Sequence, residues 1–250
     1  MEETQKPMKE MNPMELNAFL DPRKLPVKTL DGIPSFVERI SGDDEKWNRF
    51  YERLSPFYGL SERIFGKLIL GIDVKKEWEK VAGPAAFAKG SSIPEVSPGS
   101  GVYQPFLRDQ IGPSGTLVSL DLSMGMLRAC RRRRDFPRLH PLLVHGNGSN
   151  LPFRDGIFDG LFHVGGINLF SEPQKAILEF ARVVKRGGTV VIGDEGFSSE
   201  KPDRLRRKIL SKINPGFLKS KVPDLPHSLE RRSPQWYFRG CLYRLIAVRN

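Results

Sequence analysis

An alternation of short apolar runs with helical patterns between residues 93 and 193 constrains the fold of this chain more than any other feature. The segments between the runs carry apolar residues at helical spacing, as after Ser123 and after Ser171, which can each cap a helix. Gly187 and Gly188 are expected to end the second of these helices. Strands separated by helices form a parallel sheet with helices on both faces. We therefore predict an α/β fold with a doubly wound, mostly parallel sheet. The predicted strands are Ile93–Ser97, Thr116–Asp121, Leu142–His145, Phe158–Val164 and Thr189–Gly193.

Two kinds of segment precede this Rossmann-like core. Residues 1–43 mix charges and prolines without a period, so we expect an irregular N-terminal segment. Residues 44–83 repeat apolar side chains at intervals of three and four and are predicted to form a helical lid. Within it, Ser61 can cap a second helix, and a third segment runs from Asp73 to Val81.

The C-terminal third is predicted to end in an antiparallel hairpin. Gln235–Phe238 and Cys241–Val248 have strand-like patterns and are joined across Arg239 and Gly240. Before them, residues 204–213 form a basic amphipathic pattern. Helices of this kind rest on anionic membranes or RNA, and a charged outer face is the simpler interpretation.

The composition limits the cellular location and the kinds of partner that this chain can have. A formal net charge of +11 favours an anionic partner, whether a nucleotide, RNA or a membrane surface. Cys130 and Cys241 are too few for a disulfide framework or a four-cysteine zinc site, and the histidines show no metal-ligand spacing. No apolar run approaches the roughly 18 residues of a membrane span, and residues 1–20 lack the apolar core of a secretory signal. We expect a cytoplasmic protein without a metal, with a peripheral position at a membrane as the alternative.

A glycine-containing turn between the first strand and its helix is the first candidate site. The small residues of Glu95–Gly101 let the backbone approach a ligand at a helix N-terminus. Asp121 ends the next strand, where a carboxylate can bind both hydroxyls of a ribose. The glycine spacing is not G-x-G-x-x-G, and Val102 and Tyr103 occupy the start of the helix. This pattern disfavours a dinucleotide and favours a nucleoside without a pyrophosphate.

Five motifs in the same order resemble those of the class I S-adenosylmethionine-dependent methyltransferases. Residues 146–159, GNGSNLPFRDGIFD, resemble the segment G-D-A-x-x-L-P-F-x-D-x-x-F-D of the branch that includes the ubiquinone and menaquinone biosynthesis C-methyltransferases. The other matches are Glu95–Gly101 to E/D-x-G-x-G-x-G, residues 118–127 to G-x-D-x-S-x-x-M-L, Ala181–Gly188 to A-R-V-L-K-P-G-G, and Leu54–Tyr58 to the A-P-x-Y-D lid segment. The resemblance implies S-adenosylmethionine as cofactor and a methyltransferase domain over residues 84–250.

The resemblance also assigns cofactor-binding roles by position. Glu95 would organise the loop that receives the methionine part, Asp121 would bind the ribose, and Asn147 would face the adenine edge. His163, at the end of the fourth strand, would lie beside the methyl group and is the one candidate catalytic residue. The full predicted set is Tyr58, Glu95, Ser97, Gly99, Gly101, Asp121, Leu122, Met126, Asn147, Gly148 and His163.

Four positions depart from the motifs of the family. Ser97 replaces a glycine, Gly59 replaces the aspartate of the lid segment, and Pro94 removes a hydrogen-bond donor from the central strand, where a bulge or a shortened strand is expected. Asn147 replaces an aspartate, although its amide oxygen can still accept from the adenine amino group.

The function that follows is transfer of a methyl group from a sulfonium to a small, aromatic or lipid-like acceptor. The acceptor would enter between the lid and the ends of the fourth and fifth strands, near Phe57, Phe65, Asn168 and Phe170. Two alternatives stay open. An RNA methyltransferase would use the same donor site and the positive charge as a track. A catalytically silent binding protein would keep the fold without turnover.

Overall fold

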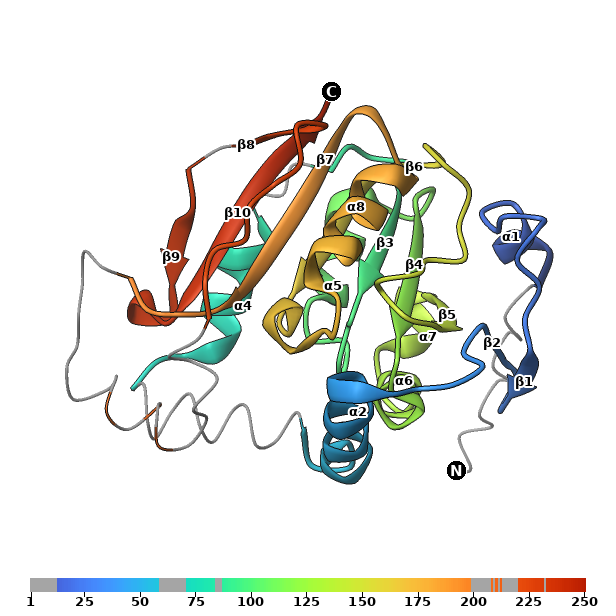
Figure 1. The fold of residues 1–250 in the computed structure, drawn as a ribbon, viewed down its shortest axis with the longest axis horizontal. Helices are drawn as coiled ribbons and strands as arrows, with labels where there is room; N and C mark the ends of the chain where they lie inside the picture. Colours follow the sequence, from blue (N-terminus) through green and yellow to red (C-terminus); the bar gives the residue numbers. More distant parts are fainter. Residues whose placement is uncertain are drawn as a thin grey trace, which may run out of the picture.

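The computed structural model describes residues 13–58, 71–83, 87–198, 208, 210, 212, 220–231 and 233–250. The strands in these ranges form one ten-stranded sheet with the order β1-β2-β5-β4-β3-β6-β7-β10-β8, and β9 pairs with β10 (Figure 1). The strands are β1 Lys28–Leu30, β2 Ile33–Ser35, β3 Ser92–Val96, β4 Thr116–Asp121, β5 Leu142–His145, β6 Phe158–Val164, β7 Val184–Glu195, β8 Leu229–Arg231, β9 Gln235–Tyr237 and β10 Leu242–Arg249.

The centre of the sheet confirms the predicted doubly wound architecture. Strands β5, β4, β3, β6 and β7 run parallel, and the chain moves outward from β3 in both directions. Alternate residues of β7 enter two separate cores, because Val190 and Ile192 pack with α8 while Val191 packs with α4 and α5. The described helices are α1 Pro13–Asn17, α2 Gly42–Leu54, α4 Val74–Ala82, α5 Gln104–Ile111, α6 Met124–Arg131, α7 Phe136–Leu139 and α8 Pro173–Val183, with 3-10 turns η3 Ile167–Leu169 and η4 Phe238–Gly240.

The effect of Pro94 is visible in the pairing of the central strand. β3 pairs with β4 over five positions, from Ser92 to Val96, but it pairs with β6 only through Glu95 and Phe162. A proline has no N–H to give to the ladder, which agrees with the sparse pairing to β6. The expected bulge or shortened strand is not seen, since β3 has five residues and pairs with β4 along its whole length.

The C-terminal hairpin is also confirmed. β9 and β10 pair antiparallel and are joined through η4, in which Arg239 has a φ of 56°. β10 in turn pairs antiparallel with β7 from Leu242 to Val248. The hairpin therefore extends the parallel sheet beside β7.

The N-terminal segment is more ordered than the sequence predicts. Within residues 13–43 the chain forms α1, β1 and β2, and β2 joins the edge of the main sheet through Ser35 and His145 of β5. Elements of three to five residues are too short to show a period, and β2 is fixed by pairing with a strand more than a hundred residues away. The prediction of an irregular segment missed them for that reason.

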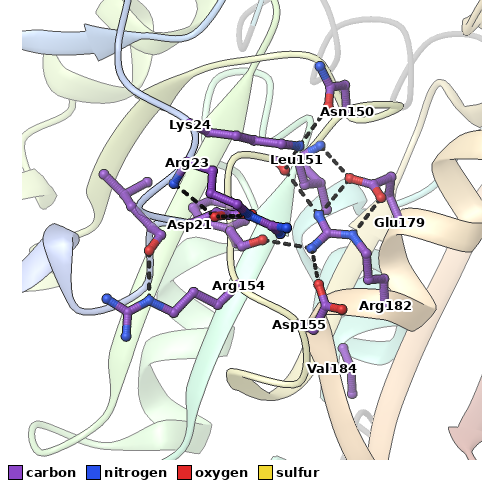
Figure 2. Close-up of polar contacts among 12 residues, drawn as sticks. Asp21, Arg23, Lys24, Asn150, Leu151, Arg154, Asp155, Glu179, Arg182 and Val184 are labelled. Atoms are coloured by element: carbon purple, nitrogen blue, oxygen red, sulfur yellow. Dashed lines mark hydrogen bonds and ion pairs between the residues drawn. The ribbon is translucent and has the colours of Figure 1, made fainter.

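Polar contacts fasten this segment to residues 150–155 (Figure 2). Lys24 Nζ donates to Asn150 Oδ1 at 2.7 Å and to the carbonyl oxygen of Leu151 at 2.8 Å. Arg154 Nε donates to the carbonyl oxygen of Leu20 at 2.8 Å. On the other side of the same loop, Arg182 of α8 donates to Asp155 Oδ1 at 2.6 Å. The loop that carries the L-P-F motif is thus held from both sides.

The two helices described within residues 44–83 have different surroundings. α2 lies against α6 and η3 at the carboxyl ends of the central strands. α4 begins after Asp73, whose side chain accepts from the N–H groups of Lys75 and Lys76, and it buries Trp78 and Val81 against α5. Of this region, α2 and the segment up to Tyr58 stay candidates for a lid, whereas α4 belongs to the core.

Two helix boundaries differ from the prediction, and two predicted helices cannot be compared. α8 begins at Pro173 with Glu172 as its N-cap, and the Ser171 hydroxyl instead accepts a hydrogen bond from the Asp44 N–H of α2 at 3.0 Å. α8 ends at Val183, and Gly187 and Gly188 already lie in β7. The helix capped by Ser61, the basic pattern at 204–213, Gly59 and Phe65 fall in parts of the chain outside, or mostly outside, the described residues.

Candidate active site

The loop after β3 has the strained backbone that a close ligand approach requires. Ser97, Gly99 and Gly101 all lie in the left-handed region, with φ values of 57°, 56° and 77°. The Ser97 N–H donates to the carbonyl oxygen of Leu120 at 2.8 Å, which fixes the loop to β4. A Cβ on Gly101 would lie 2.6 Å from Gln104 Oε1 and 2.9 Å from Cys130 Sγ. The glycine is therefore required at 101, and Ser97 carries a backbone cost of about 1–2 kcal/mol.

Asp121 ties this loop to the end of β4. Its Oδ2 accepts from the Gly99 N–H at 3.2 Å, and its Oδ1 accepts from the Ser123 N–H at 2.9 Å. The residue is 8% exposed, and burial raises the pKa of its carboxyl to about 7, with the nearby charge of Glu52 adding to the increase. The structure therefore brings Asp121, which is predicted to bind the ribose, next to the loop that is predicted to receive the methionine part of the cofactor.

Glu95 lies beneath the loop, at the end of β3. Its Oε2 accepts from Ser119 Oγ at 3.1 Å, and Ser119 Oγ also accepts from Gln104 Nε2 at 3.0 Å. Oε1 is buried and has no hydrogen-bond partner among the described residues. Burial raises the pKa of this carboxyl to about 7. Glu95 is thus a buried acceptor with one oxygen left for a donor or a cation.

The N-terminus of α6 carries a contact that the sequence did not reveal. Ser123 Oγ accepts from the Met126 N–H at 3.2 Å, which confirms the predicted cap. Glu52 of α2 accepts from Ser123 Oγ at 2.8 Å and from the Gly125 N–H at 2.7 Å. A carboxylate at a helix N-terminus is favoured by the free N–H groups there. Met126 itself is 2% exposed in this arrangement.

α2 makes a second polar contact at its own N-terminus. Asp44 Oδ2 accepts from Asn147 Nδ2 at 3.1 Å, and Asp44 Oδ1 accepts from the Ser171 N–H at 2.7 Å. Asn147 Oδ1 accepts from the Ser149 N–H at 2.8 Å. The side chain that was expected to read the adenine edge is therefore engaged with α2 and with its own loop. Neither Asp44 nor Glu52 was among the predicted site residues.

Gly148, His163 and Phe170 form a packed group beside Asn147. A Cβ on Gly148 would lie 2.6 Å from the Phe170 ring. His163 is fully buried, with its ring 5.5 Å from that of Phe170 and 5.3 Å from that of Phe180. Its Nδ1 lies 2.9 Å from the carbonyl oxygen of Val96, a contact that places a hydrogen on Nδ1, and burial lowers the pKa of the ring. A position of His163 beside a methyl group stays a prediction.

Two further predicted residues lie at the edges of this group. Tyr58 approaches the loop after β3, since a Cβ on Gly99 would lie 3.4 Å from Tyr58 Cε1. Its ring also makes an edge contact with that of Tyr51 at 5.9 Å. Leu122 is half-buried, and its carbonyl oxygen lies 3.0 Å from His145 Nε2. Tyr58 thus lies against the glycine loop, and its predicted role in cofactor binding stays a prediction.

Asp194, at the end of β7, organises the loop beyond β6 and was also missed. Its Oδ1 accepts from the Gly166 N–H, and its Oδ2 accepts from the N–H and the side-chain amide of Asn168, each at 2.8 Å. The carboxyl is 3% exposed. The loop that faces the proposed acceptor side is therefore built on one buried carboxylate.

The described residues contain neither a metal-binding cluster nor a membrane-spanning helix. Among the described residues no group of three or more His, Cys, Asp and Glu side chains could hold a metal ion. None of the helices in the described ranges is long and apolar enough to span a bilayer.

Comparison with known proteins gives a family match in the same region. A family profile described as a methyltransferase domain matches residues 94–192. Demethylmenaquinone methyltransferase of Listeria welshimeri serovar 6b is 29% identical over 152 residues, which are 60% of this chain and 63% of that protein. The same enzyme of Corynebacterium kroppenstedtii is 33% identical over 146 residues, 58% of this chain and 57% of that protein. The match thus spans about three fifths of the length of these relatives.

Solved structures agree with the fold. A SAM-dependent methyltransferase from Aquifex aeolicus superposes with a TM-score of 0.51 at 18% identity, covering 69% of this chain and 89% of that one. The Haloferax volcanii complex between the Trm112 methyltransferase activator and a putative methyltransferase gives a TM-score of 0.58 at 15% identity, covering 83% of this chain and 97% of that one. At these identities the likeness concerns the fold alone.

Proposed function

We propose that this chain, whose residues 94–192 match a methyltransferase domain, is a class I S-adenosylmethionine-dependent methyltransferase that transfers a methyl group from this donor to a small aromatic or lipid-like acceptor. The observation that carries the proposal is the contact between Asp121 and Gly99. It joins the carboxylate at the end of β4 to the glycine loop at the end of β3. We infer that the carboxylate accepts from the ribose hydroxyls while the adjacent loop backbone contacts the rest of the donor.

The residues present fit the donor in two respects. The Oε1 atom of Glu95 is buried without a partner among the described residues, which suits a hydrogen-bond donor or a cationic group such as an ammonium. The loop from Ser97 to Gly101 has left-handed backbone at three positions, so its N–H and C=O groups do not follow a helix or strand ladder. We infer that Asp121 holds the ribose hydroxyls, and that the loop above Glu95 receives the methionine part.

The donor, when bound, supplies a methyl group that is already activated on a sulfonium. The task of the protein is then to position the acceptor in line with that group and to exclude water. We infer that Tyr58, which lies against the glycine loop, and α2 cover the methionine and nucleoside sides, and that the loop built on Asp194 shapes the side from which the acceptor comes. No general base is assigned, because an acidic acceptor needs none.

The acceptor class is part of the proposal. The relatives with the matching domain are named for demethylmenaquinone, an aromatic and lipid-like acceptor. Phe57, one of the residues of the expected entry, is 66% exposed. A quinone-like ring is therefore the first acceptor to test.

The test is a transfer assay with methyl-labelled S-adenosylmethionine and three acceptors: a soluble demethylmenaquinone analogue, a phenolic lipid, and RNA. We expect label in the quinone analogue or the phenolic lipid, and a loss of most transfer in Asp121→Asn. Transfer to RNA alone would replace the proposed acceptor class with the RNA alternative. Binding of the donor without transfer to any acceptor would favour the catalytically silent protein.

A further inference from the structure

One face of α2 is polar and is directed toward the carboxyl ends of the central strands. Asp44, Asn48 and Glu52 follow one another at intervals of four and therefore share a face of the helix. The aromatic residues of α2 contact one another instead, with Trp47, Phe50 and Tyr51 in edge contacts at 5.9 Å and 5.3 Å. α2 has no fully buried residue, so its attachment to the domain depends on the polar face.

The two ends of this face are anchored on opposite sides of the proposed nucleoside site. Asp44 accepts from Asn147, which follows β5 and is assigned to the adenine edge. Glu52 accepts from Ser123 Oγ and the Gly125 N–H, next to the proposed ribose ligand Asp121. α2 therefore crosses from the adenine side to the ribose side.

Asn48 stands midway between these anchors. Its Oδ1 atom is buried and has no hydrogen-bond partner among the residues that the structure describes. Folded proteins leave few buried oxygens unsatisfied, and each exception needs an explanation. Its neighbours on the same face, Asp44 and Glu52, both have partners on the domain, which leaves Asn48 as the open acceptor on this face.

We propose that Asn48 recognises the nucleoside half of the methyl donor, with Oδ1 accepting a hydrogen bond from the adenosine. The donor atom is either the adenine amino group or a ribose hydroxyl, since both are N–H or O–H groups on the part of the ligand that α2 crosses. The inference rests on the proposed function. It makes α2 a wall of the cofactor site and Asn48 a residue that determines donor specificity.

The test compares Asn48→Leu with Arg49→Leu, the same change at the next position. The Arg49 side chain is 71% exposed, and among the described residues its ion-pair partner is Glu45 of the same helix, so it is the matched control. Leucine is close in size to asparagine and removes the unsatisfied acceptor. In the absence of ligand, Asn48→Leu is expected to melt at the wild-type temperature or above it. Its dissociation constant for S-adenosylhomocysteine, measured by calorimetry, is expected to rise about tenfold, while Arg49→Leu binds as the wild type does.

Analogues of the ligand identify the contact. S-inosylhomocysteine replaces the amino group with an oxygen, and a 2′-deoxy analogue removes a ribose hydroxyl. The wild type should discriminate against one of them, and Asn48→Leu should lose that discrimination. A merely structural role for Asn48 would lower the melting temperature and leave discrimination unchanged.

Each remaining outcome also decides the proposal. Equal affinity of wild type and Asn48→Leu for S-adenosylhomocysteine overturns the role of Asn48 and leaves the proposed function intact. If the leucine variant does not fold, Asn48→Ala is measured in its place, and unchanged affinity there is equally decisive. A folded wild type that binds neither S-adenosylhomocysteine nor S-adenosylmethionine overturns this inference together with the proposed function.

Discussion

The side-chain amide of Asn147 donates a hydrogen bond to the carboxylate of Asp44, with 3.1 Å between Nδ2 and Oδ2. The contact joins the loop after β5 to the first turn of α2, across more than a hundred residues of sequence. At position 147 the resembling family has an aspartate, which has no N–H to donate. The asparagine is therefore matched to Asp44, and the departure from the family pattern has a structural partner.

This contact predicts the effect of restoring the family residue. Asn147→Asp replaces the donor with a carboxylate that faces the carboxylate of Asp44, so a hydrogen bond is exchanged for a repulsion. We expect the free energy of unfolding to fall by about 1–3 kcal/mol and amide exchange at residues 44–54 to increase. Denaturant unfolding and hydrogen exchange measure the two effects.

The double variant Asp44→Asn with Asn147→Asp is the control for that prediction. It reverses donor and acceptor and should recover most of the lost stability, since residues in direct contact show non-additive effects. Wild-type stability in the single variant Asn147→Asp would contradict the importance of the contact.

Gly148 is predicted to be intolerant of a side chain because of one neighbour. A Cβ at this position would lie 2.6 Å from the ring of Phe170. Gly148→Ala should therefore displace that ring and destabilise the chain by about 1–3 kcal/mol. Phe170→Leu in the same chain should relieve part of the loss, as measured by thermal unfolding. If Gly148→Ala alone melts like the wild type, the ring does not close over residue 148 as described.

The raised pKa values of Glu95 and Asp121 predict that stability falls, and that affinity for the methyl donor rises, as the pH increases. Burial raises the pKa of Glu95 and of Asp121 to about 7 in the folded chain, above the values of about 4 in unfolded protein. Their contribution to stability is therefore fully present below about pH 4 and is lost as the pH rises through about 7. Thermal unfolding should show the wild type losing stability relative to Glu95→Gln between about pH 4 and pH 7, the interval between the two pKa values.

The affinity for the methyl donor should increase with pH, in contrast to the stability. Ribose hydroxyls donate to the ionised form of Asp121, so ligand affinity is expected to increase as the pH rises through about 7. Calorimetric titration with S-adenosylhomocysteine at several pH values measures this, and Asp121→Asn should flatten the profile. Affinity that falls over the same range would show that Asp121 does not accept from the ligand.

α2 is predicted to respond to the donor as a lid. Polar contacts at its two ends hold it against the domain, and it has no fully buried residue. Helices attached in this way open at low free-energy cost, and closure over a ligand protects them. Hydrogen exchange at residues 44–58 should slow on addition of S-adenosylhomocysteine. Strong and equal protection with and without the ligand would identify a fixed structural helix.

The central strands could be predicted from sequence because their signals are local. β4, β5 and β6 have the predicted bounds, since each is an apolar run that ends at a polar or turn-forming residue. The cap at Ser123 was predictable for the same reason. The short strand β2 was not, because three residues carry no period and its position depends on β5.

The site was predictable in part. The motifs identified Glu95, Asp121 and the glycine loop, which the fold brings together. They did not identify Asp44, Asn48 or Glu52, because these residues lie outside the five motifs, the nearest of which begins at Leu54. In the structure Phe50 is 50% exposed, and the polar face makes the contacts. Which face of a marginally amphipathic helix is buried depends on the polar groups that it meets, and a local pattern does not contain them.

Calorimetric titration of the full chain with S-adenosylhomocysteine tests the central claim most directly. We predict saturable binding of one ligand per chain, and a loss of affinity of about tenfold or more in Asp121→Asn, because a hydrogen bond to a charged group contributes about 1.5–3 kcal/mol. Circular dichroism of both proteins verifies that the variant is folded. A folded wild type that gives no binding heat with S-adenosylhomocysteine or S-adenosylmethionine up to roughly millimolar concentration would contradict the account.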